Sequence, residues 1–319
     1  MFSRITSLNN PVRLHFIGTI LGCTALLVSS CSSAQVRATP TLQSTSTFEM
    51  TGTASVTSSP APTGTPTETP LPPLGIGSMK VSPVDGMTLV YVPEGDFSMG
   101  NDSIDDESPQ HTVHLSAFWI DRTEVTNAMY KLCELAKVCQ KPSLSGSYGH
   151  SWYYGNLKFA NYPVVFVNFL DARSYCAWAG RRLPTEAEWE KAARGTDGRT
   201  YPWGNDSPTC LIANLTLSGR TCTGDTAPVG SYPQGASPYG ALDMAGNVME
   251  WVNDRYDPGY YKVSPSNDPP GSDKSDYRVE RGGSWYSDPN GLRVTNRNFE
   301  NPLNSYDTLG FRCAQSATP

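Results

Sequence analysis

The distribution of aromatic residues limits which part of this 319-residue chain can form a hydrophobic core. All seven tryptophans lie between Trp119 and Trp285. Residues 32–78, by contrast, are dominated by Ser, Thr, Pro, Gly and Ala, and such a segment cannot bury enough apolar surface to offset the entropy that ordering costs. We therefore predict one large domain over residues 79–319, preceded by a disordered, solvated tether over residues 31–78.

The charge balance excludes one class of partner. The formal net charge is -6 at pH 7, and no basic stripe runs along the sequence. Proteins that bind nucleic acid need a basic surface to meet the phosphate backbone. We therefore expect no nucleic-acid partner.

The first thirty residues have the anatomy of a secretory signal peptide. Two arginines precede an apolar run over residues 16–28, and this run is too short to span a bilayer. Residues 28–31 read Val-Ser-Ser-Cys, which resembles the lipobox of bacterial lipoproteins. We therefore predict a signal peptide over residues 1–30, with Cys31 as the lipidated first residue of the mature protein.

Two other interpretations compete with this one. A cleavage site at Cys23 would place the bulky Leu21 where a lipobox prefers a small residue, and it would cut the apolar run short. A plain secretory signal would leave Cys31 unmodified. The lipobox predicts an exported protein that is anchored to the bacterial cell membrane or cell surface, because several acyl chains on one cysteine give stable attachment.

Helical periodicity appears in three segments of the predicted domain. Residues 121–137 carry apolar side chains at helical spacing after Thr126, which is a good N-cap. Residues 169–179 carry a similar pattern before Gly180, which is a suitable C-cap. Thr185 opens the third helix.

The start of this third helix is the clearest local signal in the chain. Thr185 and Glu188 have capping-box spacing, and Gly195 can close the helix that they open. Short runs that are typical of strands occur at residues 87–92 and 112–120. The prediction is an α+β domain with much irregular structure.

The cysteines indicate an oxidising compartment. Six remain after Cys31, and an even number in an exported protein indicates disulfides, although six cysteines allow 15 pairings. Chain spacing favours two short bridges, and the two cysteines that remain would then pair with each other. The three predicted pairs are Cys133 with Cys139, Cys210 with Cys222, and Cys176 with Cys313. Zinc is the competing interpretation, but no Cys-x-x-Cys pair exists and the four histidines lack the spacing of ligands.

The domain also carries a series of long motifs in a defined order. They are Gly-Met-Thr-Leu-Val-Tyr-Val at residues 86–92, Gly-Arg-Arg-Leu-Pro-Thr-Glu-Ala-Glu-Trp-Glu at 180–190, Asp-Met-Ala-Gly-Asn-Val-Met-Glu-Trp at 243–251, Arg-Gly-Gly-Ser-Trp at 281–285 and Gly-Phe-Arg-Cys at 310–313. In this series the domain resembles the formylglycine-generating-enzyme (sulfatase-modifying-factor) family. The resemblance implies a single irregular α+β domain that is related to C-type lectins and stabilised by calcium and disulfides.

The resemblance also implies a chemistry and a set of ligands. The best-known members are oxygen-dependent, copper-using oxidases that convert a cysteine of sulfatases to formylglycine, and Cys176 and Cys313 match a pair that is disulfide-bonded in them. Calcium takes carboxylate and carbonyl oxygens. The matching residues are Asp243, Gly246, Val248 and Glu250 for one calcium site, and Asn214 and Asp225 for a second, weaker one. The alternative for Asp243 is a side chain that only caps a turn.

One departure from the family bears on the mechanism. The oxidases bind copper(I) through two cysteines shortly after the Gly-Gly-Ser motif, and residues 282–293 contain neither. Ser287 stands where the first belongs, and its hydroxyl cannot replace a soft thiolate ligand. Met249 stands where these enzymes commonly have a tryptophan beside the oxygen pocket. The sequence therefore argues against copper.

Two functional hypotheses follow. The first is a binding or scaffold module, in which a groove for a protein or peptide ligand is formed by Ser284, Ser287, Arg293 and Arg297. Aromatic residues and asparagines over residues 286–306 favour it, since binding loops use this mixture. The second hypothesis is a formylglycine-generating oxidase, or another oxidoreductase of that family, that works without the usual cysteines.

Overall fold

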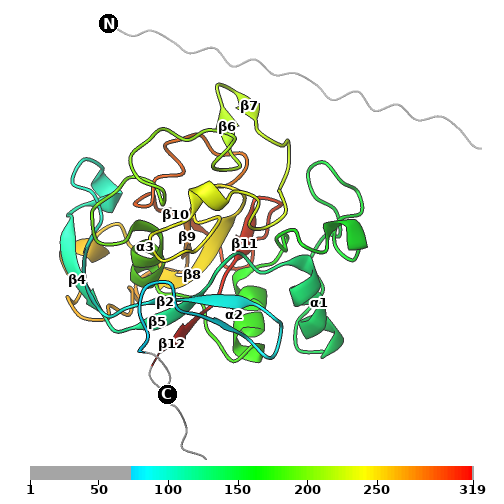
Figure 1. The fold of residues 1–319 in the computed structure, drawn as a ribbon, viewed down its shortest axis with the longest axis horizontal. Helices are drawn as coiled ribbons and strands as arrows, with labels where there is room; N and C mark the ends of the chain where they lie inside the picture. The colour runs from blue at the N-terminus through cyan, green and yellow to red at the C-terminus, as the bar shows by residue number, and fades with distance from the viewer. Residues whose placement is uncertain (1–72, 318–319) are drawn as a thin grey trace, which may run out of the picture. The chain divides into compact units, whose positions relative to one another are not determined.

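The computed structural model describes residues 73–317 and shows a mixed α/β fold with three short α-helices and several small sheets (Figure 1). The predicted signal peptide, Cys31 and most of the tether lie outside the described residues. Among the residues that are described, no helix has the length and apolar character that crossing a membrane requires. The α-helices are α1 (Asn127–Leu135), α2 (Phe169–Trp178) and α3 (Glu186–Arg194), and the 3-10 turns are η1 (Asp105–Glu107), η2 (Leu157–Phe159), η3 (Pro233–Gly235) and η4 (Tyr260–Lys262).

Two four-stranded sheets form the framework. One has the order β1-β2-β5-β12 and is antiparallel throughout, and the other has the order β10-β9-β8-β11 with β11 parallel to β8. Two hairpins, β3-β4 and β6-β7, complete the strands. The strands are β1 (Met79–Val81), β2 (Thr88–Val92), β3 (Gly95–Met99), β4 (His111–Leu115), β5 (Phe118–Asp121), β6 (Thr216–Leu217), β7 (Arg220–Thr221), β8 (Met249–Arg255), β9 (Arg278–Arg281), β10 (Asn298–Glu300), β11 (Leu309–Phe311) and β12 (Ala314–Ser316).

The helix caps agree with the sequence, but one helix start does not. The Thr126 side chain accepts a hydrogen bond from the Met129 backbone N–H, as an N-cap should. The helix nevertheless begins at Asn127 and not at residue 121. Residues 118–121 instead form β5, which pairs with β2 and β12, so sheet pairing overrides the helical pattern there.

The other local predictions hold with one correction. Thr185 and Glu188 form both bonds of a capping box, and Gly195 closes α3 with a positive φ of 72°. Gly180 follows α2 with a φ of 73°. The run predicted as one strand over residues 112–120 is two strands, because β4 pairs with β3 while β5 pairs with β2.

The interior contains two main apolar clusters. In one, α1 and α2 pack together through Tyr130 and Tyr175, whose stacked rings are 5.6 Å apart, with Phe311 beside them. In the other, α3 contributes the fully buried Trp189. Its indole N–H donates to Glu250 Oε2 at 2.8 Å, which links this cluster to β8. The C-terminal strands therefore lie between the two clusters. The loop that follows β9 leaves this sheet.

Candidate functional site

The candidate site begins where β9 ends, at two consecutive glycines. Gly282 and Gly283 have φ values of 93° and 67°, a region that suits glycine. A Cβ atom on Gly283 would lie 2.6 Å from the carbonyl oxygen of Gly291, so any side chain there would open the turn. The glycine pair therefore directs the chain out of the sheet into a tight turn that begins at Ser284.

Ser284 and Ser287 face each other across this turn. Their hydroxyl oxygens are 3.4 Å apart, and the Ser284 backbone N–H donates to Ser287 Oγ at 3.0 Å. The Tyr286 N–H donates to Ser284 Oγ at 3.2 Å. Within residues 73–317, neither hydroxyl bonds to a histidine or carboxylate that could act as a base. The serines stabilise the turn and lack the partner that a nucleophile needs.

Aromatic side chains surround the turn. The Trp285 indole is 2% exposed, and its ring centre lies 5.2 Å from that of Tyr148 and 5.4 Å from that of Tyr286. Tyr148 and Tyr286 are 71% and 67% exposed. The buried indole therefore packs against two exposed phenol rings, each of which offers an apolar face and a polar hydroxyl. We call Tyr148, Trp285 and Tyr286 the aromatic surface.

The β6-β7 hairpin supports this surface from one side. The Thr216 N–H donates to the Ser287 carbonyl at 2.8 Å, and the Thr216 hydroxyl donates to the Trp285 carbonyl at 3.2 Å. The hairpin lies inside the loop that the Cys210–Cys222 disulfide closes. In Figure 1 it stands at the top of the domain, far from α2 and β12. The crosslinked loop therefore holds the turn in place beside a small apolar cluster that includes Leu215 and Leu292.

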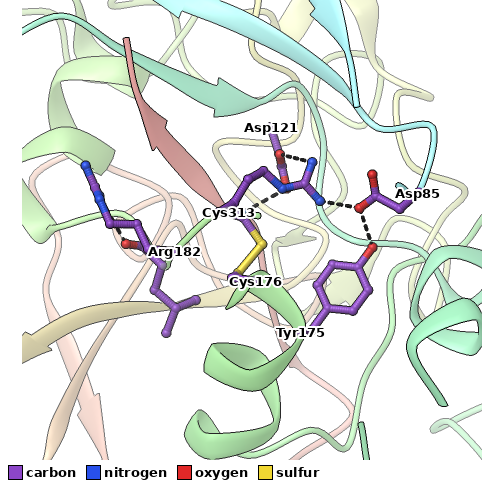
Figure 2. Close-up of a disulfide and its surroundings, with 8 residues drawn as sticks. Asp85, Asp121, Tyr175, Cys176, Arg182 and Cys313 are labelled. Atoms are coloured by element: carbon purple, nitrogen blue, oxygen red, sulfur yellow. Dashed lines mark hydrogen bonds and ion pairs between the residues drawn. A yellow bond between two sulfur atoms is a disulfide. The ribbon is translucent and has the colours of Figure 1, made fainter. Parts of the chain in front are cut away.

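All three predicted disulfides are present. The third, Cys176–Cys313, joins α2 to the segment between β11 and β12 (Figure 2). The remaining two are Cys133–Cys139 and Cys210–Cys222. No cysteine among the described residues is therefore a free thiol.

A buried polar network surrounds the Cys176–Cys313 bridge (Figure 2). The Tyr175 hydroxyl donates to Asp85 at 2.6 Å, and the Cys313 N–H donates to Asp121 at 2.9 Å. The Arg181 guanidinium forms ion pairs with both carboxylates. Burial raises the pKa of Asp121 to about 7, although the Arg181 charge opposes this. This network and the disulfide together connect β5 and α2 to the C-terminal strands.

Comparison with known proteins decides the family. The sequence model of one family, described as the sulfatase-modifying factor enzyme 1-like domain, matches residues 76–317. The chain belongs to this family. The formylglycine-generating enzyme of Streptomyces coelicolor is 36% identical over 285 residues, which cover 72% of this chain and 89% of that enzyme.

An oxygenase and a protein of known structure are also similar to this chain. The hercynine oxygenase of Mycolicibacterium smegmatis is 36% identical over 266 residues, covering 71% of this chain and 61% of that protein. The solved structure of PvdO from Pseudomonas aeruginosa has a TM-score of 0.65 and 28% identity, covering 76% of this chain and all of PvdO. The fold prediction, an irregular α+β domain like that of formylglycine-generating enzymes, is confirmed.

The family's copper chemistry does not fit the residues present in this member. Copper(I) requires soft thiolate ligands. The described cysteines are all in disulfides, and the position after the Gly-Gly-Ser motif holds the Ser287 hydroxyl. The turn after the Gly-Gly-Ser motif therefore offers copper(I) no soft ligand.

The first predicted calcium site fits an ion only in part. Asp243 has a left-handed backbone, and its carboxylate accepts a hydrogen bond from the Gly230 N–H at 2.6 Å. Burial and the nearby charge of Asp243 raise the pKa of Glu124. Glu124 is fully buried, and its Oε2 has no hydrogen-bond partner, which suits a hard cation beside these two carboxyls. Glu250 differs, because Arg312 and Trp189 occupy both of its oxygens.

Carboxylates alone do not complete this site. No group of three or more His, Cys, Asp or Glu within the described part of the chain could hold a metal ion. Backbone carbonyls, such as the predicted ones of Gly246 and Val248, would have to supply further ligands. Calcium here stays a prediction, with Asp243 and Glu124 as the available carboxylates.

The second predicted calcium site is a closed hydrogen-bond cluster. The Asn214 amide donates to the Asp225 carbonyl at 2.9 Å, so the structure does bring the two residues together. The Asp225 carboxylate accepts bonds from Ser147 Oγ, the Gly149 N–H and the Thr226 N–H at 2.5, 2.8 and 2.7 Å. These bonds satisfy the Asp225 carboxylate within the protein, and a second ion stays a prediction.

The two predicted groove arginines are held in ion pairs. Arg293 forms two hydrogen bonds to Glu107, at 2.7 and 2.8 Å. Arg297 is 4% exposed, and its guanidinium forms two bonds to Glu186 at 2.6 and 2.9 Å. Arg297 therefore lies in the interior and does not line an open groove. Of the four predicted groove residues, Ser284 and Ser287 lie in the turn beside the aromatic surface, where Ser284 is buried and Ser287 is half-buried.

Sequence reasoning missed Tyr148 and Glu124 as site residues. Tyr148 lies in a Ser- and Gly-rich run that reads as a loop, and only the fold places it against Trp285. Glu124 lies between β5 and α1, and nothing in the sequence separates it from the structural residues around it. Its burial next to Asp243 is the distinguishing feature.

Proposed function

We propose that this domain is a non-oxidase binding or scaffold module whose ligand, a protein or peptide, binds at the aromatic surface. One observation carries the proposal: the turn that would supply copper ligands instead contains two hydroxyls that accept bonds from backbone N–H groups. A hydroxyl in such a bond is neither a soft ligand nor an activated nucleophile. The rigid turn remains and presents aromatic side chains.

The aromatic surface supports a binding role by its geometry. Tyr148 and Tyr286 offer open ring faces and hydroxyl groups, while the Trp285 indole between them is fixed by a bond from Nε1 to the Asp307 carbonyl at 3.3 Å. Such rings lose little conformational entropy on binding because they have few rotatable bonds. A protein or peptide segment with apolar and hydrogen-bonding side chains fits this chemistry.

The proposal includes display outside the cytoplasm. The three disulfides favour an oxidising compartment. The predicted lipid on Cys31 and the tether would then present the aromatic surface at a distance from the membrane.

The alternative is an oxidase or oxygenase, as the names of the two curated relatives indicate. Copper(I) titration of the disulfide-intact domain, followed by oxygen uptake with a sulfatase-type cysteine peptide, separates the two. We expect neither stoichiometric copper binding nor turnover. Tight binding with formation of formylglycine would overturn the proposal.

A positive test uses a displayed library of random peptides. We expect peptides selected on the wild-type domain to lose binding to the Tyr148→Ala/Tyr286→Ala double variant, by about tenfold or more. The matched control is Tyr277→Ala, which removes another exposed tyrosine. Selected peptides that bind both variants and the wild type equally would exclude the aromatic surface as the ligand site.

A further inference from the structure

A cavity of about 400 Å³ lies beside the first turn of α2, away from the residues of the aromatic surface. Its walls include three arginines, Arg173, Arg255 and Arg278, from α2, β8 and β9. Apolar side chains, including Leu170 and Leu303, complete the lining. We call this cavity the arginine pocket. An apolar cavity with a few convergent charges is the usual form of a small-molecule site.

The positive charges of the arginine pocket are poorly balanced. Burial and the neighbouring charges of Arg255 and Arg173 lower the pKa of Arg278, and the Asp254 charge opposes this only in part. Arg278 is therefore repelled by both other arginines of the pocket. The one carboxylate in the lining is Asp276, which is fully exposed and 3.5 Å from Arg255. An exposed pair at that distance is weak. An anion in the cavity would relieve the repulsion.

Donor groups are also available. Arg278 Nη1 donates to the Asn253 carbonyl at 2.5 Å, and the guanidinium carbon lies 4.2 Å from the centre of the Phe169 ring. In the described part of the chain, the Arg278 side chain makes no other hydrogen bond, and the exposed Arg173 makes none. Planar guanidinium groups with free N–H donors are suited to binding carboxylates and phosphates.

The geometry points to a binding site for a small amphiphilic oxyanion, whose carboxylate or phosphate head contacts Arg173 and Arg278 while an apolar tail packs on Leu170 and Leu303. A second cavity, of about 540 Å³, shares Arg255 and Arg278 with the arginine pocket. This inference does not depend on the proposed function, because it uses none of the residues of the aromatic surface.

The test is calorimetric titration of the wild-type protein with four probes: hexyl phosphate, hexanoate, inorganic phosphate and hexylammonium. We expect saturable binding of the two amphiphilic anions, with hexyl phosphate at least about tenfold tighter than inorganic phosphate because of its buried tail. We expect no binding of hexylammonium. The difference between hexanoate and hexyl phosphate identifies the preferred head group.

Variants then locate the site. Arg173→Gln should weaken hexyl phosphate binding by about tenfold, since it removes a charged donor. Arg173 is exposed and unpaired within the described residues, so this variant should fold, and Arg278→Gln adds a second measurement. Arg220→Gln, at an exposed arginine on β7, is the control and should bind normally. Failure of both amphiphilic anions to bind, equal affinity for hexylammonium or for inorganic phosphate, or unchanged binding by Arg173→Gln would each overturn the inference.

Discussion

Arg312 and Glu250 form a two-pronged ion pair in the interior, with Arg312 Nε 2.7 Å from Glu250 Oε2 and Nη2 2.6 Å from Oε1. Both side chains are fully buried, and Arg312 also donates to the carbonyls of Asp121 and Leu242. The pair connects β8 to the segment after β11. It also means that a calcium ion could use Glu250 only by competing with a guanidinium group, which shifts attention to Asp243 and Glu124.

We predict that calcium stabilises the domain through Asp243 and Glu124. A bound ion adds to the free energy of unfolding by mass action, so millimolar calcium should raise the thermal midpoint by about 5 °C relative to excess chelator. Differential scanning calorimetry of the wild type gives this shift. Asp243→Asn and Glu124→Gln should each reduce it, while Asp288→Asn, at an exposed turn, should not. Superimposed wild-type curves with calcium and with chelator would show that the turn needs no ion.

The helix ends and the buried ion pairs show which features of the fold and of the site can be inferred from the sequence. The capping box of Thr185 and Glu188 is local, so spacing alone predicts it. The start of α1 is not local, because pairing of Leu89 with Asp121 holds residues 118–121 in a strand. In the same way, the position of Arg297 depends on Glu186, which is 111 residues away. Motif order therefore predicts the fold and the location of the serine turn, whereas ion pairs between distant segments determine which charged side chains are exposed.

The anchor can be tested by fractionation. Replacement of Cys31 by serine should move the mature domain from the membrane fraction to the soluble fraction, or leave an unprocessed precursor, because the acyl chains would be lost. The domain should remain folded, with an unchanged thermal midpoint, because the predicted tether contributes no core residues. Cys23→Ser is the control and should leave the protein on membranes. Membrane release by Cys23→Ser and not by Cys31→Ser would assign the lipid to the other cysteine.

The Cys176–Cys313 bridge should contribute more stability than the short bridge Cys133–Cys139. The two sequence separations are 137 and 6 residues, and closing the longer loop removes more entropy from the unfolded chain. Serine at both positions of the long bridge should cost about 4–5 kcal/mol in the free energy of unfolding, against about 2 kcal/mol for the short one. Urea denaturation of the two double variants gives the comparison. Equal losses would show that native-state packing, rather than chain entropy, determines the contribution of each bridge.

A buried acid in β9 should make the domain less stable as the pH rises. Glu280 is 4% exposed, and its Oε1 has no hydrogen-bond partner. Burial, together with the charge of Glu300, raises the pKa of Glu280 to about 8. The folded state then holds the proton more tightly than the unfolded chain, whose glutamate pKa is about 4.3.

The sign of the effect follows from this difference. The stabilisation from the bound proton is fully present below about pH 4.3 and is lost as the pH rises to about 8, an effect of up to about 3–5 kcal/mol. Glu280→Gln resembles the protonated form at every pH. Urea denaturation at pH 5, 7 and 9 should therefore show a free-energy difference between variant and wild type that grows in favour of the variant with pH. Glu300→Gln, which removes the neighbouring charge, should lower the pKa of Glu280, so that the loss of stability ends at a lower pH and is smaller than in the wild type. A difference between Glu280→Gln and wild type that stays constant from pH 5 to 9 would mean that Glu280 is already ionised in the folded protein at pH 5.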